Sequence, residues 1–313
     1  MRCQDTSKEI VNNYGHGLKL KSAICITTRN RDYALKRCLE ALAKLTIQPA
    51  TIVVSDDSTD KYTQRENRLL TQQYPNAVYL EGPRAGVCAN RNNALRIALE
   101  GNPDLVSFVD DDICLDQYFL ENAIEAYRNI PENDRKSTIL TGMAEEDGKV
   151  TEGLRLNFRG YFTRSSKPEV VNIHAAIFPS SLFKKVAWDE NIFFGYEDAE
   201  LCLRANKHGF RVLALPSLIS LDTESGTGTL TQEGDTRKLS DYHIYVEAAR
   251  LYVGVKRYHI ISSSVIRLVL FLITYFAHMS IFLLKKNSLS KFSLILKTAQ
   301  VDRLFKYKIP DIL

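Results

Sequence analysis

Apolar runs and helical patterns alternate along the first third of the chain. Ser22–Thr28 is a short apolar run, as expected for a strand buried on both faces of a parallel sheet. The next segment, Asp32–Leu45, carries leucines at helical spacing. The further predicted strands are Thr51–Ser55, Ala77–Leu80 and Leu105–Val109, and the further predicted helices are Thr63–Tyr74 and Asn90–Leu99. This alternation predicts an α/β fold with a doubly wound, mainly parallel sheet.

Polar residues gather where three of the predicted strands end. The three clusters are Thr28-Arg29-Asn30, Asp56-Asp57 and Asp110-Asp111-Asp112. Ligands of doubly wound sheets bind beyond the carboxyl ends of the strands, so we expect the clusters to meet in one crevice. An Asp after a strand can also simply cap the next helix. That alternative suffices for any single cluster but poorly explains all three together.

The second half of the chain is harder to interpret. It begins with a polar, weakly periodic segment, Ala144–Pro168. A segment of that length is usually functional or mobile, and we expect this one to bind the acceptor. Beyond it, the order of helix and strand signals resumes. The segments are Ala144–Pro168 (polar), Ser180–Val186 (helix), Asp198–Gly209 (helix) and Phe210–Leu215 (strand, ended by Pro216).

Asp110 and Asp112 form a D-x-D pattern at a predicted strand end. Two carboxylates one residue apart on a turn can share a hard cation such as Mg²⁺ or Mn²⁺. Such a cation would also hold diphosphate oxygens and offset charge on a leaving group. Solvated acidic turns are common, but three adjacent Asp residues beside an apolar strand are costly without a cation or hydrogen bonds.

Acidic residues also open the predicted helix that begins near Asp198. Asp198, together with Glu197, is the candidate catalytic group, because a carboxylate facing the crevice can take a proton from an attacking hydroxyl. Glu200 and Arg204 are spaced for an ordinary i,i+4 ion pair. We therefore expect catalysis from the first pair and a structural role for the second.

Arg84 and Arg91 follow the third predicted strand and are candidate phosphate ligands, because arginine offers fixed, charge-assisted donors. Plain surface exposure is the alternative for Arg84. The chain has no P-loop pattern and no nucleophile elbow. Its six histidines show no zinc-binding spacing, so we expect them to be structural or exposed.

Composition and charge bound the protein further. The 313 residues suit one large domain, or one domain with a smaller appendage. The net charge of +4 is uneven: residues 250–313 hold 11 basic and two acidic residues, a balance of +9. A basic tail on an acidic body indicates an anionic partner for the tail. We expect a lead-in over 1–20, a catalytic domain over 21–235 and a helical segment over 236–313.

The apolar run Leu268–Leu284 carries no Lys, Arg, Asp or Glu, and basic residues flank it. We predict contact of residues 259–308 with a membrane surface, lying in one leaflet rather than spanning it. Helices packed on the catalytic domain or on a partner subunit are the alternative. Six cysteines without a CxxC pair and a polar N-terminus, MRCQDTSKEI, favour reduced thiols and a catalytic part at the cytoplasmic face of the membrane. Nucleic acid is not expected as a partner.

Taken in order, several motifs over residues 22–230 resemble glycosyltransferase family 2, whose members have the GT-A fold. They are ICITTRNR, VVSDDSTD, GVCANRNNAL, FVDDD and NIHAAIFPSSLFKKVAWDENIFFGYEDAELCLR. These match the family's nucleotide-binding turn, second-strand acidic motif, helix start, D-x-D and the stretch that ends in its E-D catalytic motif.

The resemblance implies inverting, single-displacement transfer of a sugar from a nucleotide-diphosphate donor. It implies Asp198 as general base, Asp112 as the main metal ligand and Asp110 as a contact of ribose or metal. Asp57 would contact the nucleobase of the donor. Asp56 is the alternative for this contact, because the Gly that the family usually has between the acidic pair and the Ser is missing here. Thr28, Arg29 and Asn30 would form the nucleotide-binding turn.

The sequence departs from the family at one metal position. PSLISLDTESGTG has Asp222 where the family often has a metal-binding His. Asp222 would bind Mn²⁺ or Mg²⁺ in its place, or metal binding is weakened, or the alignment slips. Residues Thr223–Thr229 would form a loop that closes over the diphosphate, with Gly226 and Gly228 as hinges.

We therefore predict a metal-dependent glycosyltransferase of the hexosyltransferase type, acting in polysaccharide biosynthesis on a hydroxyl of a glycan or lipid-linked acceptor. A UDP-sugar is the leading expectation for the donor. The alternatives are a nucleotidyltransferase on a similar sheet and a non-catalytic nucleotide-sugar-binding relative. The first has no evident use for GYEDAELCLR, and the retained Asp110, Asp112 and Asp198 argue against the second.

Overall fold

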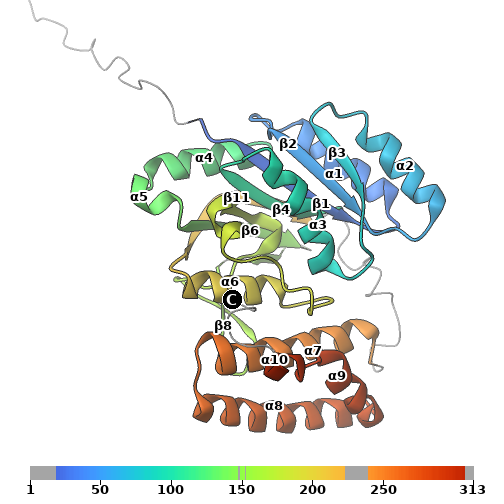
Figure 1. The fold of residues 1–313 in the computed structure, drawn as a ribbon, viewed down its shortest axis with the longest axis vertical. Helices are drawn as coiled ribbons and strands as arrows, with labels where there is room; N and C mark the ends of the chain where they lie inside the picture. Colours follow the sequence, from blue (N-terminus) through green and yellow to red (C-terminus); the bar gives the residue numbers. More distant parts are fainter. Residues whose placement is uncertain (1–18, 147–148, 152, 223–238, 307–313) are drawn as a thin grey trace, which may run out of the picture.

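A twisted sheet with helices on both faces forms one part of the molecule, and a layer of helices forms the other (Figure 1). The structure is a computed structural model, and it describes residues 19–146, 149–151, 153–222 and 239–306. The described residues form a nine-stranded sheet in the order β3-β2-β1-β4-β10-β6-β11-β5, with β7 paired to β6. Five cysteines lie in the described part, and none of these five forms a disulfide.

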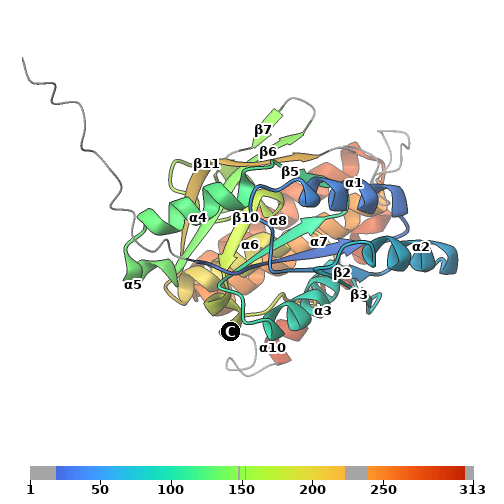
Figure 2. The same ribbon diagram turned by 90° about the horizontal axis from the view of Figure 1, so that it is seen from above.

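The first half of the sheet is parallel, as predicted. Its strands are β1 (Ser22–Thr28), β2 (Thr51–Asp56), β3 (Ala77–Glu81) and β4 (Leu105–Asp110), and its helices are α1 (Asp32–Ala43), α2 (Lys61–Thr71) and α3 (Val87–Glu100). Leu35, Leu39 and Leu42 of α1 pack on one face of the sheet. Cys88, Ala94 and Leu95 of α3 pack on the other face. The doubly wound arrangement predicted from the alternating pattern is confirmed (Figure 2).

The second half of the sheet mixes strand directions. β10 is antiparallel to both β4 and β6, β11 is parallel to β6, and β5 is antiparallel to β11. The strands are β5 (Ile113–Leu115), β6 (Thr138–Glu146), β7 (Lys149–Thr151), β10 (Ala176–Pro179) and β11 (Arg211–Asp222). The helices of this half are α4 (Phe119–Asn129), α5 (Glu132–Arg135) and α6 (Glu197–Lys207). The predicted helix from Asp198 is therefore confirmed to within a residue at its start.

One sequence expectation in this half is wrong, and a second holds only in part. Pro216 does not end the strand, because the pairing of β11 with β6 shifts register between Ala214 and Ile219, and the proline falls in that irregular stretch. The segment near Ser180–Val186 forms only a short 3₁₀ helix over Ser180–Lys184. The polar segment over 144–168, for which the sequence predicted no elements, contains a hairpin of β8 (Leu154–Leu156) and β9 (Phe162–Arg164).

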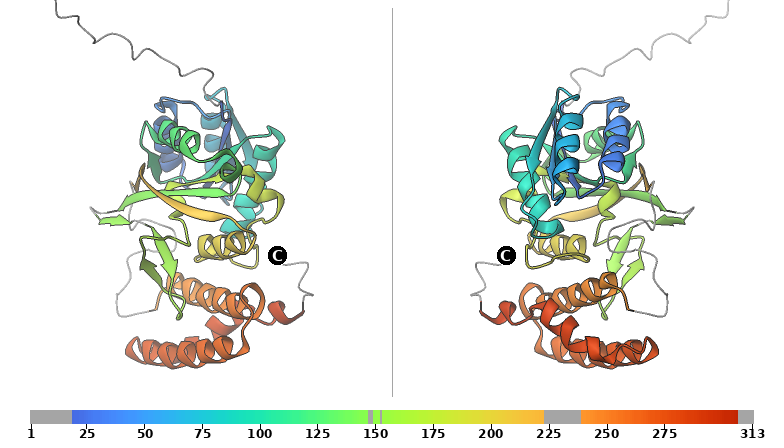
Figure 3. Two further views of the ribbon diagram at one scale, coloured as in Figure 1. Left: turned by 90° about the vertical axis from the view of Figure 1, so that its left-hand side faces the viewer. Right: turned by 90° about the vertical axis from the view of Figure 1, so that its right-hand side faces the viewer.

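The C-terminal part forms a helical layer below the sheet (Figure 3). It consists of α7 (Asp241–Lys256), a π-helical turn (Arg257–Ile261), α8 (Val265–Lys285), α9 (Phe292–Ala299) and α10 (Arg303–Lys306). α7 lies between α6 and α8. The predicted domain boundary at 235/236 and the predicted loop Thr223–Thr229, with Gly226 and Gly228, lie outside the described residues.

Candidate active site

The ends of β1 and β4 bring two of the predicted polar clusters together. β1 pairs in parallel with β4, and Thr27 stands opposite Asp110. The Thr27 hydroxyl donates to Asp110 Oδ1 at 2.9 Å, and the Thr28 hydroxyl donates to Asp111 Oδ2 at 2.7 Å. Since β2 lies on the other side of β1 and ends at Asp56, all three predicted clusters lie at one edge of the sheet.

Arg31, which the sequence did not single out, bridges two carboxylates of the D-x-D turn. Its Nη2 contacts Asp111 Oδ1, and its Nη1 donates to Asp112 Oδ2 at 2.7 Å. Asp111 is fully buried, whereas the side chains of Asp112 and Asp110 remain 17% and 26% exposed. We call these four residues the aspartate cluster. The cation demanded by adjacent buried carboxylates is thus supplied, in this structure, by an arginine.

The two rival carboxylates at the end of β2 have different surroundings. Asp56 is fully buried. It accepts from Ser58 N, Asn67 Nδ2 and Tyr79 Oη at 2.8, 2.9 and 3.0 Å. Asp57 accepts from Arg84 N at 2.8 Å, and burial raises its pKa. Because the protein's own donors occupy Asp56, the geometry favours Asp57 as the nucleotide contact, which stays a prediction.

The loops after β1, β2 and β3 are tied to one another. Asn30 N donates to Ser58 Oγ at 2.7 Å, and Arg84 Nε donates to the Ser58 carbonyl at 3.0 Å. Asn30 and Arg84 both have left-handed backbone, with φ of 56° and 55°. The side chains of Arg29 and Arg84 are exposed at this edge, and each acts to lower the pKa of Asp57. Phosphate or base contacts from these residues remain predictions.

Arg91 links the end of β4 to the start of α6. Its Nη1 donates to Glu197 Oε1 at 2.9 Å, and its Nη2 lies 3.2 Å from Asp110 Oδ1. The guanidinium is 2% exposed and stacks over Trp188, with 5.0 Å from Cζ to the ring centroid. Arg91 was predicted to bind phosphate, but in this structure it is held inside the protein. Its evident role is to hold two carboxylates of the site in place.

Asp198 lies in the first turn of α6, and the backbone just before this helix has an unusual conformation. Gly195 and Tyr196 precede the helix with φ of 86° and 61°. A left-handed Tyr is uncommon, and here its ring is held by stacking on Phe162 at a centroid distance of 4.9 Å. Asp198 is partly buried, and its Oδ1 accepts from Ala199 N at 2.7 Å. The strained turn therefore fixes where this carboxylate points.

The surroundings of Asp198 suit a base that works near neutral pH. Burial raises its pKa to about 7, and the neighbouring charge of Glu197 adds to the rise, while Arg91 opposes it. A carboxylate tuned in this way can both accept and release a proton near pH 7.

Asp198 faces a cavity of about 330 Å³. Asp222 and His174 line the same cavity. Its apolar wall includes Leu154 and Phe162 of the β8–β9 hairpin and Val246 of α7. A carboxylate in a cleft with convergent polar groups is the arrangement expected at an active site.

The predicted metal ligands have the right chemistry for Mg²⁺ or Mn²⁺. Asp222 ends β11 and pairs with Ile113, next to Asp112. Burial raises the pKa of Asp112, and the charges of Asp110 and Asp222 raise it further, so the three carboxylates share one neighbourhood. Among the described residues, no three His, Cys, Asp or Glu side chains are close enough to hold a metal ion alone. Carboxylate oxygens are ligands that Mg²⁺ accepts together with substrate phosphate oxygens.

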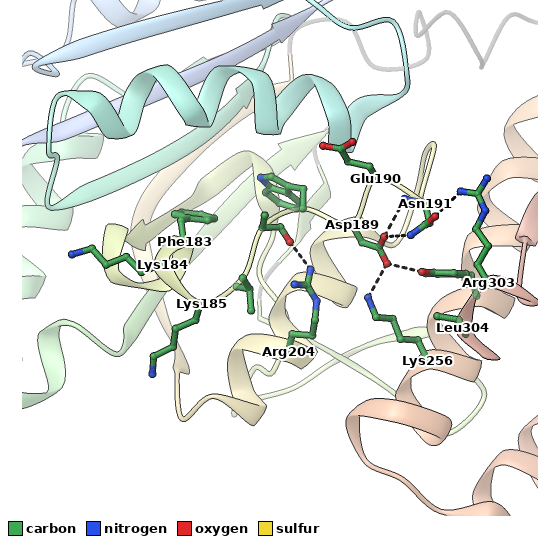
Figure 4. A pocket seen from close by; sticks show the side chains of 14 residues that line it. Phe183, Lys184, Lys185, Asp189, Glu190, Asn191, Arg204, Lys256, Arg303 and Leu304 are labelled. Carbon is green, nitrogen blue, oxygen red and sulfur yellow. Dashed lines mark hydrogen bonds and ion pairs between the residues drawn. The ribbon is translucent and has the colours of Figure 1, made fainter. Parts of the chain in front are cut away.

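A second group of buried charges joins α6 to α7, and Figure 4 shows the contact of Lys256 with Asp189 in this group. Lys256 Nζ donates to Asp189 Oδ2 at 2.7 Å and to Glu200 Oε1 at 2.5 Å. Arg204 donates to both oxygens of Glu200 at 2.6 Å, which confirms the predicted i,i+4 pair. We call these four residues the Lys256 cluster. It borders a cavity of about 530 Å³ that is distinct from the Asp198 cavity.

Sequence reasoning missed Arg31, His174 and the α7 wall. Arg31 lies one residue beyond the predicted nucleotide-binding turn, and no pattern marks its target. His174 was grouped with the structural or exposed histidines, although it lies in the NIHAAIF segment that carried the resemblance. The contribution of α7 depends on how distant segments pack.

A family model described as "Glycosyl transferase family 2" matches residues 23–191, which is more than half of the chain. The match covers β1 to the Trp188–Asn191 turn and ends before Asp198. No curated protein matches the chain.

Several solved structures are similar in fold. The structure of S. aureus TarS 1-349 in complex with UDP is 19% identical, with a TM-score of 0.54 over 82% of this chain and 72% of that one. S. aureus TarS 1-349 alone is 17% identical, with a TM-score of 0.50 over 76% of this chain and 64% of that one. The mannosyltransferase PcManGT from Pyrobaculum calidifontis, in complex with GDP-Man and Mn²⁺, is 13% identical, with a TM-score of 0.52 over 93% and 89%. At these identities the similarity establishes the fold.

Proposed function

The chain belongs to glycosyl transferase family 2, and from this premise we propose that it transfers a sugar from a nucleotide-diphosphate donor to an acceptor hydroxyl. The observation that carries the proposal is the Arg91 bridge. One guanidinium contacts both Asp110, at the nucleotide edge of the sheet, and Glu197, beside Asp198. One arginine head group therefore connects the proposed donor side to the residue that directly precedes the proposed base.

Asp198 is the proposed general base. It takes the proton from the acceptor hydroxyl while that oxygen attacks the anomeric carbon of the donor sugar. The bond from the anomeric carbon to the diphosphate oxygen breaks, and its electron pair leaves with the nucleoside diphosphate. Attack from the face opposite the leaving group inverts the anomeric configuration in a single displacement.

Asp110 and Asp112 are the residues proposed to hold Mn²⁺ or Mg²⁺, with Asp222 as the third candidate. When bound, the cation offsets negative charge on the diphosphate. Arg31 also donates to Asp112, so a bound cation would share this carboxylate with the guanidinium. PcManGT was solved with Mn²⁺, which supports this cofactor assignment.

The proposed donor is a UDP-sugar, bound along the edge formed by Thr28, Arg29, Asn30, Asp57 and Arg84. The similar structure of S. aureus TarS 1-349 contains UDP, and that of PcManGT contains GDP-Man. Both ligands carry a nucleoside diphosphate and are bound to the same fold. They therefore support a nucleotide-diphosphate donor more strongly than they support uracil as its nucleobase.

The proposed acceptor is a hydroxyl of a glycan or of a lipid-linked glycan, entering the cavity that Asp198 faces. The β8–β9 hairpin lines this cavity. It lies within the polar segment over 144–168 that was expected to bind the acceptor. We propose a cytoplasmic setting for the reaction, because the cysteines are widely spaced and include no CxxC pair.

The first experiment is a thermal-shift screen of UDP, GDP, dTDP and CDP, each with and without Mn²⁺. A ligand that binds only the folded state raises the melting temperature by mass action. We expect a shift with UDP that grows when Mn²⁺ is present. A nucleotide shift without any effect of Mn²⁺ argues against the metal assignment alone. Absence of any shift contradicts the donor site and favours a non-catalytic relative.

A further inference from the structure

The outward face of α8 is apolar along its whole length. Of the described helices, α8 alone is long and apolar enough to cross a membrane, with a mean hydropathy of 1.9, and only 17% of that apolar window is buried. Its exposed residues recur at helical spacing and form one stripe. Its exposed members include Ile266, Ile273 and Ile281, at 74%, 61% and 53%. An apolar stripe of this length on a protein surface marks an interaction site.

The inward face of α8 is fixed to the rest of the protein. Phe271, Tyr275, Met279 and Leu283 recur every four residues and are fully or almost fully buried. Tyr275 Oη donates to the Glu247 carbonyl on α7 at 3.0 Å. The ring of Phe271 lies so close to Gly254 of α7 that a Cβ there would stand 2.0 Å from it. α8 therefore lies along α7, at the end of the molecule farthest from the parallel half of the sheet (Figures 1 and 3).

Cations flank the stripe. Arg267 and Lys285 are both exposed. They are 18 residues apart, which is five turns at 3.6 residues per turn, so they lie on the same edge of the stripe. Lys291 and Lys297 follow on or beside α9 and are also exposed. The only acidic residue between positions 257 and 306 is Asp302. An apolar strip edged by lysine and arginine complements an anionic bilayer surface.

We propose that the outer face of α8 docks on an anionic phospholipid bilayer, lying in one leaflet with its axis along the membrane. The contacts of Tyr275 and Phe271 with α7 hold α8 against the protein, which opposes its departure to span the bilayer. Arg267 and Lys285 extend to the phosphate groups while the stripe enters the acyl boundary.

Docking in this orientation sets the height of the proposed active site. α7 contacts α8 on one side, and its residues Tyr242 and Val246 line the Asp198 cavity on the other. One helix layer, of about 10 Å, therefore separates the cavity from the docked helix. This step of the inference rests on the proposed function. The arrangement favours a lipid-linked glycan over a freely soluble one as the acceptor.

The test is co-sedimentation of the full chain with vesicles. One set contains phosphatidylcholine alone, and the other contains added phosphatidylglycerol. We expect binding to the anionic vesicles to exceed binding to the neutral ones at least tenfold, and to weaken as salt is raised. No nucleotide takes part, so failure here leaves the transfer reaction untouched.

Two variants separate the apolar and charged contributions. The stripe variant, Ile266→Gln/Ile273→Gln/Ile281→Gln, should lose binding to both vesicle types by roughly a hundredfold or more. The charge variant, Lys285→Gln/Lys291→Gln/Lys297→Gln, should lose roughly ten- to hundredfold on anionic vesicles alone. Matched controls change exposed residues of the catalytic part: Leu69→Gln/Val78→Gln/Leu213→Gln and Lys44→Gln/Lys136→Gln/Lys167→Gln.

Each remaining outcome overturns the proposal. If the wild-type chain stays in the supernatant with both vesicle types, it does not bind the bilayer and the proposal is wrong. A stripe variant that sediments like its control removes α8 from the interface. Binding that the charge variant leaves unchanged points to a spanning helix. A wild-type dimer in detergent-free light scattering, made monomeric by the stripe variant, assigns the stripe to a second copy of the chain.

Discussion

The aspartate cluster and the Lys256 cluster use the same device in two settings. Each places buried carboxylates around a cationic side chain. In the Lys256 cluster the partners are almost fully buried, with Lys256 and Glu200 1% and 0% exposed. In the aspartate cluster Asp112 stays accessible beside the proposed nucleotide edge. A closed cluster can only join elements, whereas an open one can exchange its arginine for a ligand.

Their positions reinforce this contrast. The Lys256 cluster joins α6 to α7 and the Asp189 turn, so it connects the helix that carries Asp198 to the helical layer. The aspartate cluster joins only the ends of neighbouring strands and their loops. We expect changes in the closed cluster to lower stability first, and changes around the open one to lower activity first.

The largest effect on the active-site side should come from Asp198→Asn. Removing the general base should lower kcat by about 10²- to 10⁴-fold, because no group then takes the hydroxyl proton. The melting temperature should stay the same or rise, since the replaced carboxylate is costly to bury. Turnover of UDP-sugar in a coupled UDP-release assay measures the first effect, and calorimetry measures the second. Wild-type turnover in the variant would remove the catalytic assignment.

The largest effect on the structural side should come from Lys256→Met. It leaves Asp189 and Glu200 buried without their shared cation and should cost about 3–5 kcal/mol of unfolding free energy. Urea denaturation measures the loss. Burial raises the pKa of Asp189, but the charge and hydrogen bond of Lys256, with hydrogen bonds from Tyr252 and Asn191 N, together lower it from 3.8 to about 2. The loss should therefore be full above the unfolded value of 3.8 and should shrink as the pH falls towards 2. As a control, Lys306→Met breaks an exposed pair with Asp302 and should change stability by less than about 1 kcal/mol. Equal losses of unfolding free energy in Lys256→Met and Lys306→Met would contradict the structural role that we assign to the Lys256 cluster.

Arg31→Gln tests whether the open cluster exchanges its cation. The fully buried Asp111 loses a partner, so unfolding free energy without metal should fall by about 1–3 kcal/mol. Mn²⁺ affinity, measured by titration calorimetry, should rise, because Asp112 no longer has a competing guanidinium. Arg68→Gln, which breaks an exposed pair with Glu81, is the matched control. Weaker Mn²⁺ binding in Arg31→Gln would mean that Arg31 supports the metal site.

The smallest expected effect is a shift in pH dependence. With the pKa of Asp198 at about 7, kcat/KM should fall about tenfold per pH unit below that value, because the protonated carboxyl is no base. Glu197→Gln removes a negative neighbour that raises this pKa, so the acidic limb should move to lower pH. The exposed control Glu190→Gln should leave the limb in place. A limb that does not move with Glu197→Gln would show that another group titrates.

Much of the fold could be predicted because its signals are local. Apolar runs gave β1, β2 and β4 almost to the residue, since strands buried on both faces need continuous apolar sequence. Strand ends located the polar clusters for the same reason, because parallel strands deliver them to one edge. The mixed half was poorly predicted. Pro216 looked like a terminator, and only the register shift against β6 shows how a strand continues past it.

The candidate site likewise has residues that could be proposed from sequence and residues whose roles could not. Asp110, Asp112 and Asp198 could be proposed from sequence because each follows a strand or opens a helix. Arg31 was missed, since its partners are 80 and 81 positions away in the chain. Asp56 and Asp57 could not be separated until their hydrogen bonds were seen. Arg91 was assigned to phosphate, because sequence cannot show that Glu197 and Asp110 reach it first.

The sequence by itself determined the family, the parallel half of the sheet and the carboxylates that we propose carry out the chemistry. These follow from local order and residue type, which need no knowledge of what packs where. Only the tertiary structure decided which carboxylates are neutralised by Arg31 or Lys256, which loops surround Asp198, and that α8 lies along α7 with its apolar stripe outward. Those facts depend on contacts between residues far apart in the chain, and no local pattern encodes them.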